Sequence, residues 1–253
     1  MAIILGILQG ITEWLPISSS GHLAIFQYYF EEEPPILFDV ILHLGSLTVI
    51  SYILRNEIVQ FLKAIPLTFK KIGKNNNLEE NEKLVLLVIL VSLPTALIGL
   101  FLDGQIIENF YEKIYLVGIC LIITGIVIWR SKDYSNNLDL NQLSYFRAFM
   151  VGVVQGLSIL PGISRSGTTI AFLRFFGIES IKAAKFSFLI FIPAIIGATM
   201  LKLNEAESTL EEVGLNSIIF GFLASVISSF LSIKFLLKVI NNQQFHYFTP
   251  YCL

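Results

Sequence analysis

The sequence contains little charge and no concentrated basic region. Only 14% of its 253 residues are charged, whereas a soluble domain carries about 25%. The mean hydropathy is +0.73, and the apolar residues come in long blocks, which is typical of a polytopic membrane protein. No basic patch stands apart from the loops, so we do not expect nucleic-acid binding. The net charge of -2 identifies no partner.

Cysteine is also scarce. The chain has two cysteines, Cys120 inside an apolar run and Cys252 next to the last residue. This placement excludes a disulfide framework and a cysteine-based metal centre. The N-terminus lacks the basic region of a cleavable signal, and Glu13 interrupts its apolar run, so we do not predict a signal peptide there.

Five apolar stretches are long enough to cross a membrane. A hydrocarbon core of about 30 Å takes roughly 20 helical residues. The predicted spans are approximately 36–54, 84–102, 114–130, 185–201 and 215–237. Between the first two, the polar stretch Asn56–Glu82 is predicted to contain an amphipathic surface helix over Ile58–Phe69 and otherwise a loop.

Two further apolar segments, 2–30 and 147–180, are broken near the middle. The first contains WLPISSSGH and the second contains LPGISRSGTT. Proline removes a backbone donor and clashes with the preceding turn. The break leaves backbone groups without helical hydrogen bonds. Such groups are tolerated at membrane depth only where protein or water bonds to them. Both segments are therefore predicted to be re-entrant helix pairs whose polar breaks point into the protein.

The two broken segments are related by an internal repeat. A shift of 146 residues aligns seven identical pairs. The residues of the first segment are Gly6, Gln9, Gly10, Ile17, Ser18, Ser20 and Gly21, and their counterparts are Gly152, Gln155, Gly156, Ile163, Ser164, Ser166 and Gly167. Broken segments at matching positions of two repeats mark a binding site near the membrane midplane.

The distribution of lysine and arginine predicts the orientation of the repeats. If 36–54 runs from outside to inside, 14 of the 17 basic residues lie inside and Arg165 lies in the core. The other two, Lys113 and Lys202, lie in the predicted external loops 103–113 and 202–214. Every loop then satisfies the positive-inside rule. The first re-entrant pair enters from outside and the second from inside, so the two halves are inverted copies.

The predicted fold is an all-α polytopic membrane protein with an inverted-topology repeat. Its two re-entrant helix pairs meet in the membrane, and it has about six transmembrane helices in a single integral membrane domain. The first repeat is 1–130 and the second is 147–253. The sixth helix would follow Lys238, where the polar sequence suggests that the chain stops early.

Polar residues of the first re-entrant pair suggest a site. Gln9 and Glu13 are four residues apart and share a helix face. A carboxylate at membrane depth is costly, and is either paired or functional. Glu13 is thus either a salt-bridged or protonated acid, or a metal ligand assisted by the carbonyl oxygen of Gln9. Oxygen ligands of this kind favour Mg²⁺ or Ca²⁺.

The break itself carries three serines and a histidine. Ser18, Ser19 and Ser20 can cap the next helix, or they can bind an anion such as phosphate together with the amides of the helix start. His22 is either a structural histidine or a general base, acid or nucleophile. His43 lies inside an apparent span, where it either lines the site or packs in the core.

The second break supplies an arginine, and Arg165 in a membrane core requires an anionic partner. That partner is either Glu13 or a phosphate or diphosphate held in bidentate fashion. Hydroxyls and amides surround it in the sequence, at Ser164, Ser166, Gly167, Thr168 and Thr169. Together the two breaks provide the groups for phosphoryl transfer, and their depth suggests a substrate with a lipid tail.

These motifs resemble those of the undecaprenyl-diphosphate phosphatases, also called bacitracin-resistance proteins. Gln9-Gly10-Ile11-Thr12-Glu13 followed by LPISSSGH is similar to the family's (E/Q)xxxE signature. Pro161-Gly162-Ile163-Ser164-Arg165-Ser166-Gly167-Thr168-Thr169 is similar to its PGxSRSGxT signature. The flanking spans are similar over nearly the whole chain.

The resemblance implies an enzyme of the bacterial inner membrane, open to the external side, that removes the terminal phosphate of undecaprenyl diphosphate. This reaction recycles the carrier lipid of cell-wall synthesis and gives bacitracin resistance. It also implies dependence on a divalent cation, held by Glu13 and Gln9. Ser19 would be the nucleophile, His22 an acid/base or alternative nucleophile, and Arg165 the diphosphate ligand, aided by Ser164 and Thr169. A transporter of a polyprenyl phosphate is the alternative function, and homodimer formation stays open.

Overall fold

The computed structural model describes residues 1–31, 34–72, 78–102, 113–134 and 137–253. Within these ranges the chain forms helices, and its only β structure is an isolated bridge between Leu138 and Ile178. Five helices of the described part are long and apolar enough to cross a membrane. The prediction of an all-α polytopic membrane protein is confirmed.

The predicted spans correspond to five long helices. They are α3 (Ile36–Ile53), α5 (Glu80–Phe101), α7 (Ile114–Arg130), α10 (Ser180–Lys202) and α12 (Leu215–Asn241). Helix α5 begins four residues before its apolar run because Glu79 and Glu82 form a reciprocal capping box, which satisfies two of the free donors at the helix start.

Two polar connections are more helical than the sequence predicted. The predicted surface helix Ile58–Phe69 is part of a longer helix, α4 (Arg55–Ile72). The external loop predicted at 202–214 contains α11 (Ala206–Val213). The extensions of α4 are mainly charged, with Glu57 in the first turn and Lys70 and Lys71 in the last, and these charges complement the helix dipole. In α11, Ala206, Leu210 and Val213 share one apolar face. Most of the predicted loop 103–113 lies outside the described residues.

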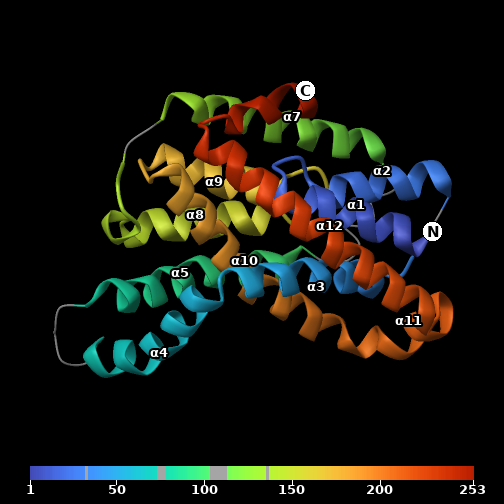
Figure 1. The fold of residues 1–253 in the computed structure, drawn as a ribbon, viewed down its shortest axis with the longest axis horizontal. Helices are drawn as coiled ribbons and strands as arrows, with labels where there is room; N and C mark the ends of the chain where they lie inside the picture. Colours follow the sequence, from blue (N-terminus) through green and yellow to red (C-terminus); the bar gives the residue numbers. More distant parts are fainter. Residues whose placement is uncertain (32–33, 73–77, 103–112, 135–136) are drawn as a thin grey trace.

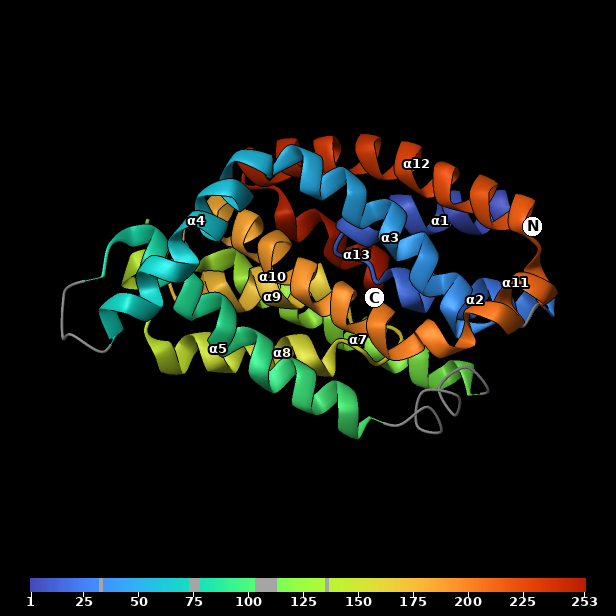
Figure 2. The same ribbon diagram turned by 90° about the horizontal axis from the view of Figure 1, so that it is seen from below.

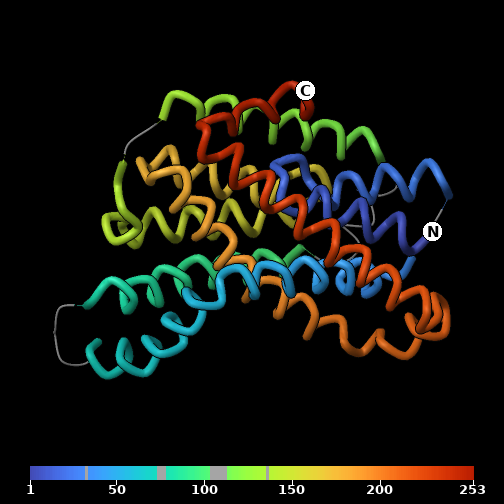
Figure 3. The backbone as a smooth tube through the Cα atoms, viewed as in Figure 1, coloured from blue at the N-terminus to red at the C-terminus, as the bar shows by residue number. Residues whose placement is uncertain are grey.

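Both broken segments form helix pairs. The first consists of α1 (Ala2–Trp14) and α2 (Ser19–Phe30), and the second of α8 (Tyr145–Leu157) and α9 (Arg165–Phe175). Figures 1 and 3 show the first pair entering from the end of the molecule where the N-terminus lies, and the second from the opposite end. The breaks of both pairs meet in the middle of the molecule.

The long helices pack on these pairs in matching ways. Helix α12 lies along α1, and α5 lies along α8, as Figure 2 shows from below. A shift of 146 residues places α1 on α8 and places α5 (80–101) on 226–247, which overlaps the second half of α12, so the two packings agree with an inverted repeat. The division of the chain into repeats 1–130 and 147–253 stays a prediction. After α12, the short helices η4 (Phe245–Phe248) and α13 (Thr249–Cys252) pack against α7.

Candidate active site between the two broken helix pairs

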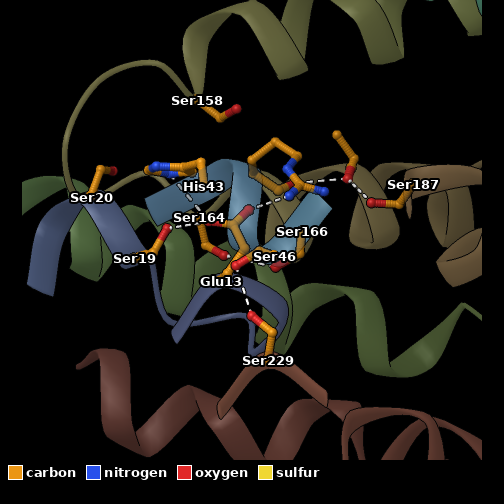
Figure 4. A network of polar contacts seen from close by, with 12 residues as sticks. Glu13, Ser19, Ser20, His43, Ser46, Ser158, Ser164, Ser166, Ser187 and Ser229 are labelled. Carbon is orange, nitrogen blue, oxygen red and sulfur yellow. Dashed lines mark hydrogen bonds and ion pairs between the residues drawn. The ribbon is translucent and has the colours of Figure 1, made fainter. Parts of the chain in front are cut away.

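The carboxylate of Glu13 is the centre of a polar cluster at the end of α1. Its Oε1 forms an ion pair with Nη2 of Arg165, which begins α9. Its Oε2 accepts hydrogen bonds from Gln9 Nε2 at 2.7 Å and from Ser19 Oγ at 2.8 Å. The same oxygen lies 3.3 Å from Nε2 of His43 on α3. Figure 4 shows Glu13 with Ser19 and His43 beside it. With Gln9 and Arg165, side chains from four helices contact this one acid.

The tips of the two helix pairs interlock around this cluster. Ser18 is the N-cap of α2, and its Oγ accepts a hydrogen bond from the amide of Gly21 at 3.2 Å and from that of Gly162 in the second break at 3.1 Å. A Cβ on Gly21 would lie 3.0 Å from the backbone of Gly162. Only a glycine allows this approach without movement, and the contact fixes one break against the other.

Ser164 repeats the role of Ser18 in the second pair. It is the N-cap of α9, and its Oγ accepts a hydrogen bond from the amide of Gly167 at 3.1 Å. Gly167 therefore corresponds to Gly21, which donates its amide to Ser18 in the first pair. Ser20 and Ser166 are also equivalent, and each lies close to the capping serine, with Oγ atoms 3.3 and 3.4 Å apart. The repeated sequence therefore forms the same side-chain capping contacts twice, although the backbone differs, with φ of 67° at Ser18 and -72° at Ser164.

Arg165 is held among aromatic rings and has unused hydrogen-bonding capacity. Its guanidinium carbon lies 3.8 Å from the centre of the Phe191 ring and 5.7 Å from that of Trp14. Its Nη1 is buried and has no hydrogen-bond partner among the described residues. A buried guanidinium nitrogen without an acceptor is costly, so this atom is a candidate contact for an anionic ligand.

The two threonines of the second motif bond mainly to the protein itself. Thr168 Oγ1 donates to the carbonyl of Ser164 at 2.8 Å, and Thr169 Oγ1 donates to the carbonyl of Arg165 at 2.7 Å. Thr169 also contacts Ser187 Oγ at 2.6 Å. These hydroxyls stabilise the start of α9. Their predicted contact with substrate stays a prediction.

The imidazole that contacts Glu13 belongs to His43, whereas the sequence favoured His22. The ring of His22 bonds through Nδ1 to the carbonyl of Ser18 and through Nε2 to the hydroxyl of Tyr251, both at 2.7 Å. It also stacks on the Tyr251 ring. The sequence analysis left the role of His43 open. A signal was present, however, because Asp39, His43 and Ser46 recur at i, i+4 and i+7 and share one face of the otherwise apolar α3.

Gln9 and Glu13 were predicted to hold a divalent cation, and their atoms fit that role in part. Gln9 Oε1 is buried and accepts no hydrogen bond from the described residues, so it has the capacity to contact a cation, although it is Nε2 of this amide that contacts Glu13. No cluster of three or more acidic, histidine or cysteine side chains accompanies them in those residues. This donor set suits Mg²⁺, which commonly binds through one or two carboxylates together with substrate phosphates.

Comparisons with known proteins agree with this arrangement. The model of a family described as "Bacitracin resistance protein BacA" matches residues 2–253. A protein of Desulfosudis oleivorans named undecaprenyl-diphosphatase is 38% identical, over 99% of this chain and 93% of its own length. Proteins of the same name from Methanobrevibacter smithii and Alkaliphilus metalliredigens are 38% and 39% identical, over 99% of this chain and 92% and 93% of their own lengths.

Proposed function

Because the chain belongs to the family of the bacitracin resistance protein BacA, we propose that it hydrolyses undecaprenyl diphosphate to undecaprenyl phosphate and inorganic phosphate. Relatives that cover nearly the whole chain carry the name of this activity. The observation that supports a catalytic site most directly is the ion pair between Glu13 and Arg165. It joins the two broken helix pairs, and the arginine retains a free buried nitrogen.

The diphosphate would bind at Arg165. The guanidinium presents several N–H donors in a planar fork that suits phosphate oxygens. Its Nη2 now pairs with Glu13, while its Nη1 has no acceptor in the described part of the chain. The start of α9, which Arg165 opens, adds the positive end of a helix dipole. Substrate binding would therefore satisfy the free nitrogen and draw the guanidinium away from Glu13.

Ser19 is the side chain best placed to attack the terminal phosphorus. Its Oγ donates to Oε2 of Glu13 at 2.8 Å, so the carboxylate can accept the serine proton. In the proposed step, a bond forms between Ser19 Oγ and the terminal phosphorus. The bond from that phosphorus to the bridging oxygen breaks, and undecaprenyl phosphate leaves. Water then hydrolyses the phosphoserine and releases inorganic phosphate.

Two other nucleophiles are consistent with the sequence, namely His22 and a water molecule activated by it. Both are less well supported, because both nitrogens of the His22 ring are engaged with Ser18 and Tyr251. The stereochemistry at phosphorus separates the routes. Net retention is expected for a phosphoenzyme formed on Ser19 or His22, and net inversion for direct attack by water.

A divalent cation, Mg²⁺ or Ca²⁺, is part of the proposal. Glu13 and Gln9 Oε1 would hold it, and when bound it would supply positive charge that neutralises the diphosphate. The proposed location is the bacterial inner membrane, with the site open to the external side and with membrane lipids around the protein. We leave the oligomeric state open between a monomer and a homodimer.

Ser19→Ala tests the proposed chemistry. We expect kcat for farnesyl diphosphate to fall by about 10²–10⁴-fold, because the variant has no hydroxyl to pass its proton to Glu13. Phosphate release by detergent-solubilised protein measures the change. Ser158→Ala is a matched control, because the Ser158 hydroxyl bonds to the carbonyl of Gln155 and not to Glu13. If the wild type releases no phosphate with any divalent cation, a transporter of polyprenyl phosphate becomes the better assignment.

Gln9→Glu tests the role of the amide next to Glu13. The variant would place a second carboxylate where Nε2 of Gln9 now donates at 2.7 Å. Two carboxylates so close repel each other unless a proton or a cation lies between them. We expect the melting midpoint of the variant to rise on addition of Mg²⁺ by several degrees more than that of the wild type. An equal rise in both proteins would place the cation away from residue 9.

A further inference from the structure

His43 contacts the central carboxylate from a helix outside both broken pairs. It lies in the middle of α3, and its side chain is 19% exposed. Its Nδ1 lies 2.8 Å from the carbonyl oxygen of Asp39, one turn earlier, and its Nε2 lies 3.3 Å from Oε2 of Glu13. Each ring nitrogen thus faces one oxygen, and a flip of the imidazole by half a turn would break both contacts.

These contacts determine what His43 presents to Glu13. A carbonyl oxygen only accepts hydrogen bonds, so Nδ1 must be the donor toward Asp39. Nε2 therefore faces Glu13 either with a proton that it donates, or with a lone pair that accepts one from the carboxyl group. In both cases a proton lies between the two side chains, and His43 holds Oε2 on the side of Ser19.

The contact with His43 becomes more important when substrate binds. In the present arrangement Arg165 holds Oε1, and Gln9, Ser19 and His43 surround Oε2. If the diphosphate draws Arg165 away, Oε1 loses its partner, and among the described residues His43 is the side chain from outside both broken pairs that still holds the carboxylate, through Oε2. The other groups near the ring are the Asp39 carboxylate, which Gln27 binds, and the hydroxyl of Ser46, one turn further along α3.

We propose that His43 is a positioning residue for the hydrolysis, which keeps the Glu13 carboxylate directed at Ser19 after Arg165 has transferred to the diphosphate. The inference rests on the roles proposed above for Glu13, Ser19 and Arg165. It assigns to α3 a part in the reaction that the two sequence motifs do not contain. His43 acts through Glu13 and makes no contact with the reacting phosphorus.

Two substitutions at position 43 test this role. His43→Leu removes the donor and keeps an apolar side chain of similar reach. We expect it to lower kcat for farnesyl diphosphate by about 10- to 100-fold, the effect of losing one hydrogen bond to a charged group, while KM changes by less than about 3-fold. His43→Gln restores an N–H donor, and we expect kcat within about 3-fold of the wild type. His246→Leu is the matched control, because His246 lies in η4 and contacts Tyr247.

The outcomes are distinguishable. A normal kcat in His43→Leu overturns the inference, as does equal loss in the leucine and glutamine variants. If His43→Leu lowers the melting midpoint so far that unfolding explains the lost activity, the contribution of His43 is packing alone. Glu13→Ala and Arg165→Ala are measured in parallel. If those two variants retain activity, the proposed site is wrong. If they lose it while His43→Leu does not, only the role of His43 is wrong.

Discussion

Arg165→Ala is expected to lower kcat/KM for undecaprenyl diphosphate by about 10³-fold or more, the range seen when an arginine that stabilises a transferring phosphoryl group is removed. The guanidinium is mostly buried, faces the Phe191 ring and has one nitrogen free for a ligand. In such surroundings a fixed positive charge interacts strongly with the developing negative charge of the transition state. Phosphate release from detergent-solubilised protein measures the loss.

Controls separate this effect from unfolding. Removal of one partner of a buried ion pair costs about 3–5 kcal/mol, so the melting midpoint must be measured beside the activity. Arg165→Lys keeps the charge but not the planar guanidinium. Relative to Arg165→Ala, we expect this variant to regain more of the stability than of the activity. Arg147→Ala is a matched control, since Arg147 is exposed at the start of α8 and its guanidinium donates to the carbonyl of Phe176, not to Glu13. If Arg165→Lys has full activity, charge alone binds the diphosphate.

Much of the fold follows from features that the sequence displays directly. Long apolar runs must become helices in a membrane, because lipid cannot bond to free backbone groups. The breaks at Pro16 and Pro161 are visible because proline ends a helix. Ser18 and Gly21 recur as Ser164 and Gly167, and each serine accepts the corresponding capping bond from its glycine.

The contacts of the site could be predicted only in part. The sequence identified Glu13 and Arg165 as residues that need partners, because isolated charges are too costly at membrane depth. It left open whether they pair with each other, and the structure shows that they do. It did not identify the neighbours of Glu13 on α3, since the side on which two apolar helices meet depends on packing between distant segments. His43 was for this reason ambiguous, and the partner of His22, Tyr251, was not foreseen.

Glycine residues on α1 and α8 lead to a second large expected effect. A Cβ on Gly6 would lie 2.2 Å from the carbonyl oxygen of Gly221 on α12, and a Cβ on Gly152 would lie 2.3 Å from that of Val91 on α5. Backbone atoms of the neighbouring helix block both positions, so a side chain can enter only if the helices separate. Small residues permit this close packing of membrane helices.

Gly6→Leu and Gly152→Leu should therefore destabilise the protein by at least about 1–3 kcal/mol each, the usual cost of overpacking, and should reduce the yield of folded protein in detergent. The melting midpoint and the elution profile on gel filtration measure the effect. Gly118→Leu and Gly197→Leu are matched controls, because a Cβ at either helical position meets no atom within 4 Å. Equal damage in the first two variants is what two inverted copies of one packing require. If Gly6→Leu unfolds the protein while Gly152→Leu behaves like the controls, the two halves do not share this packing, and the repeat is confined to the loops around the site.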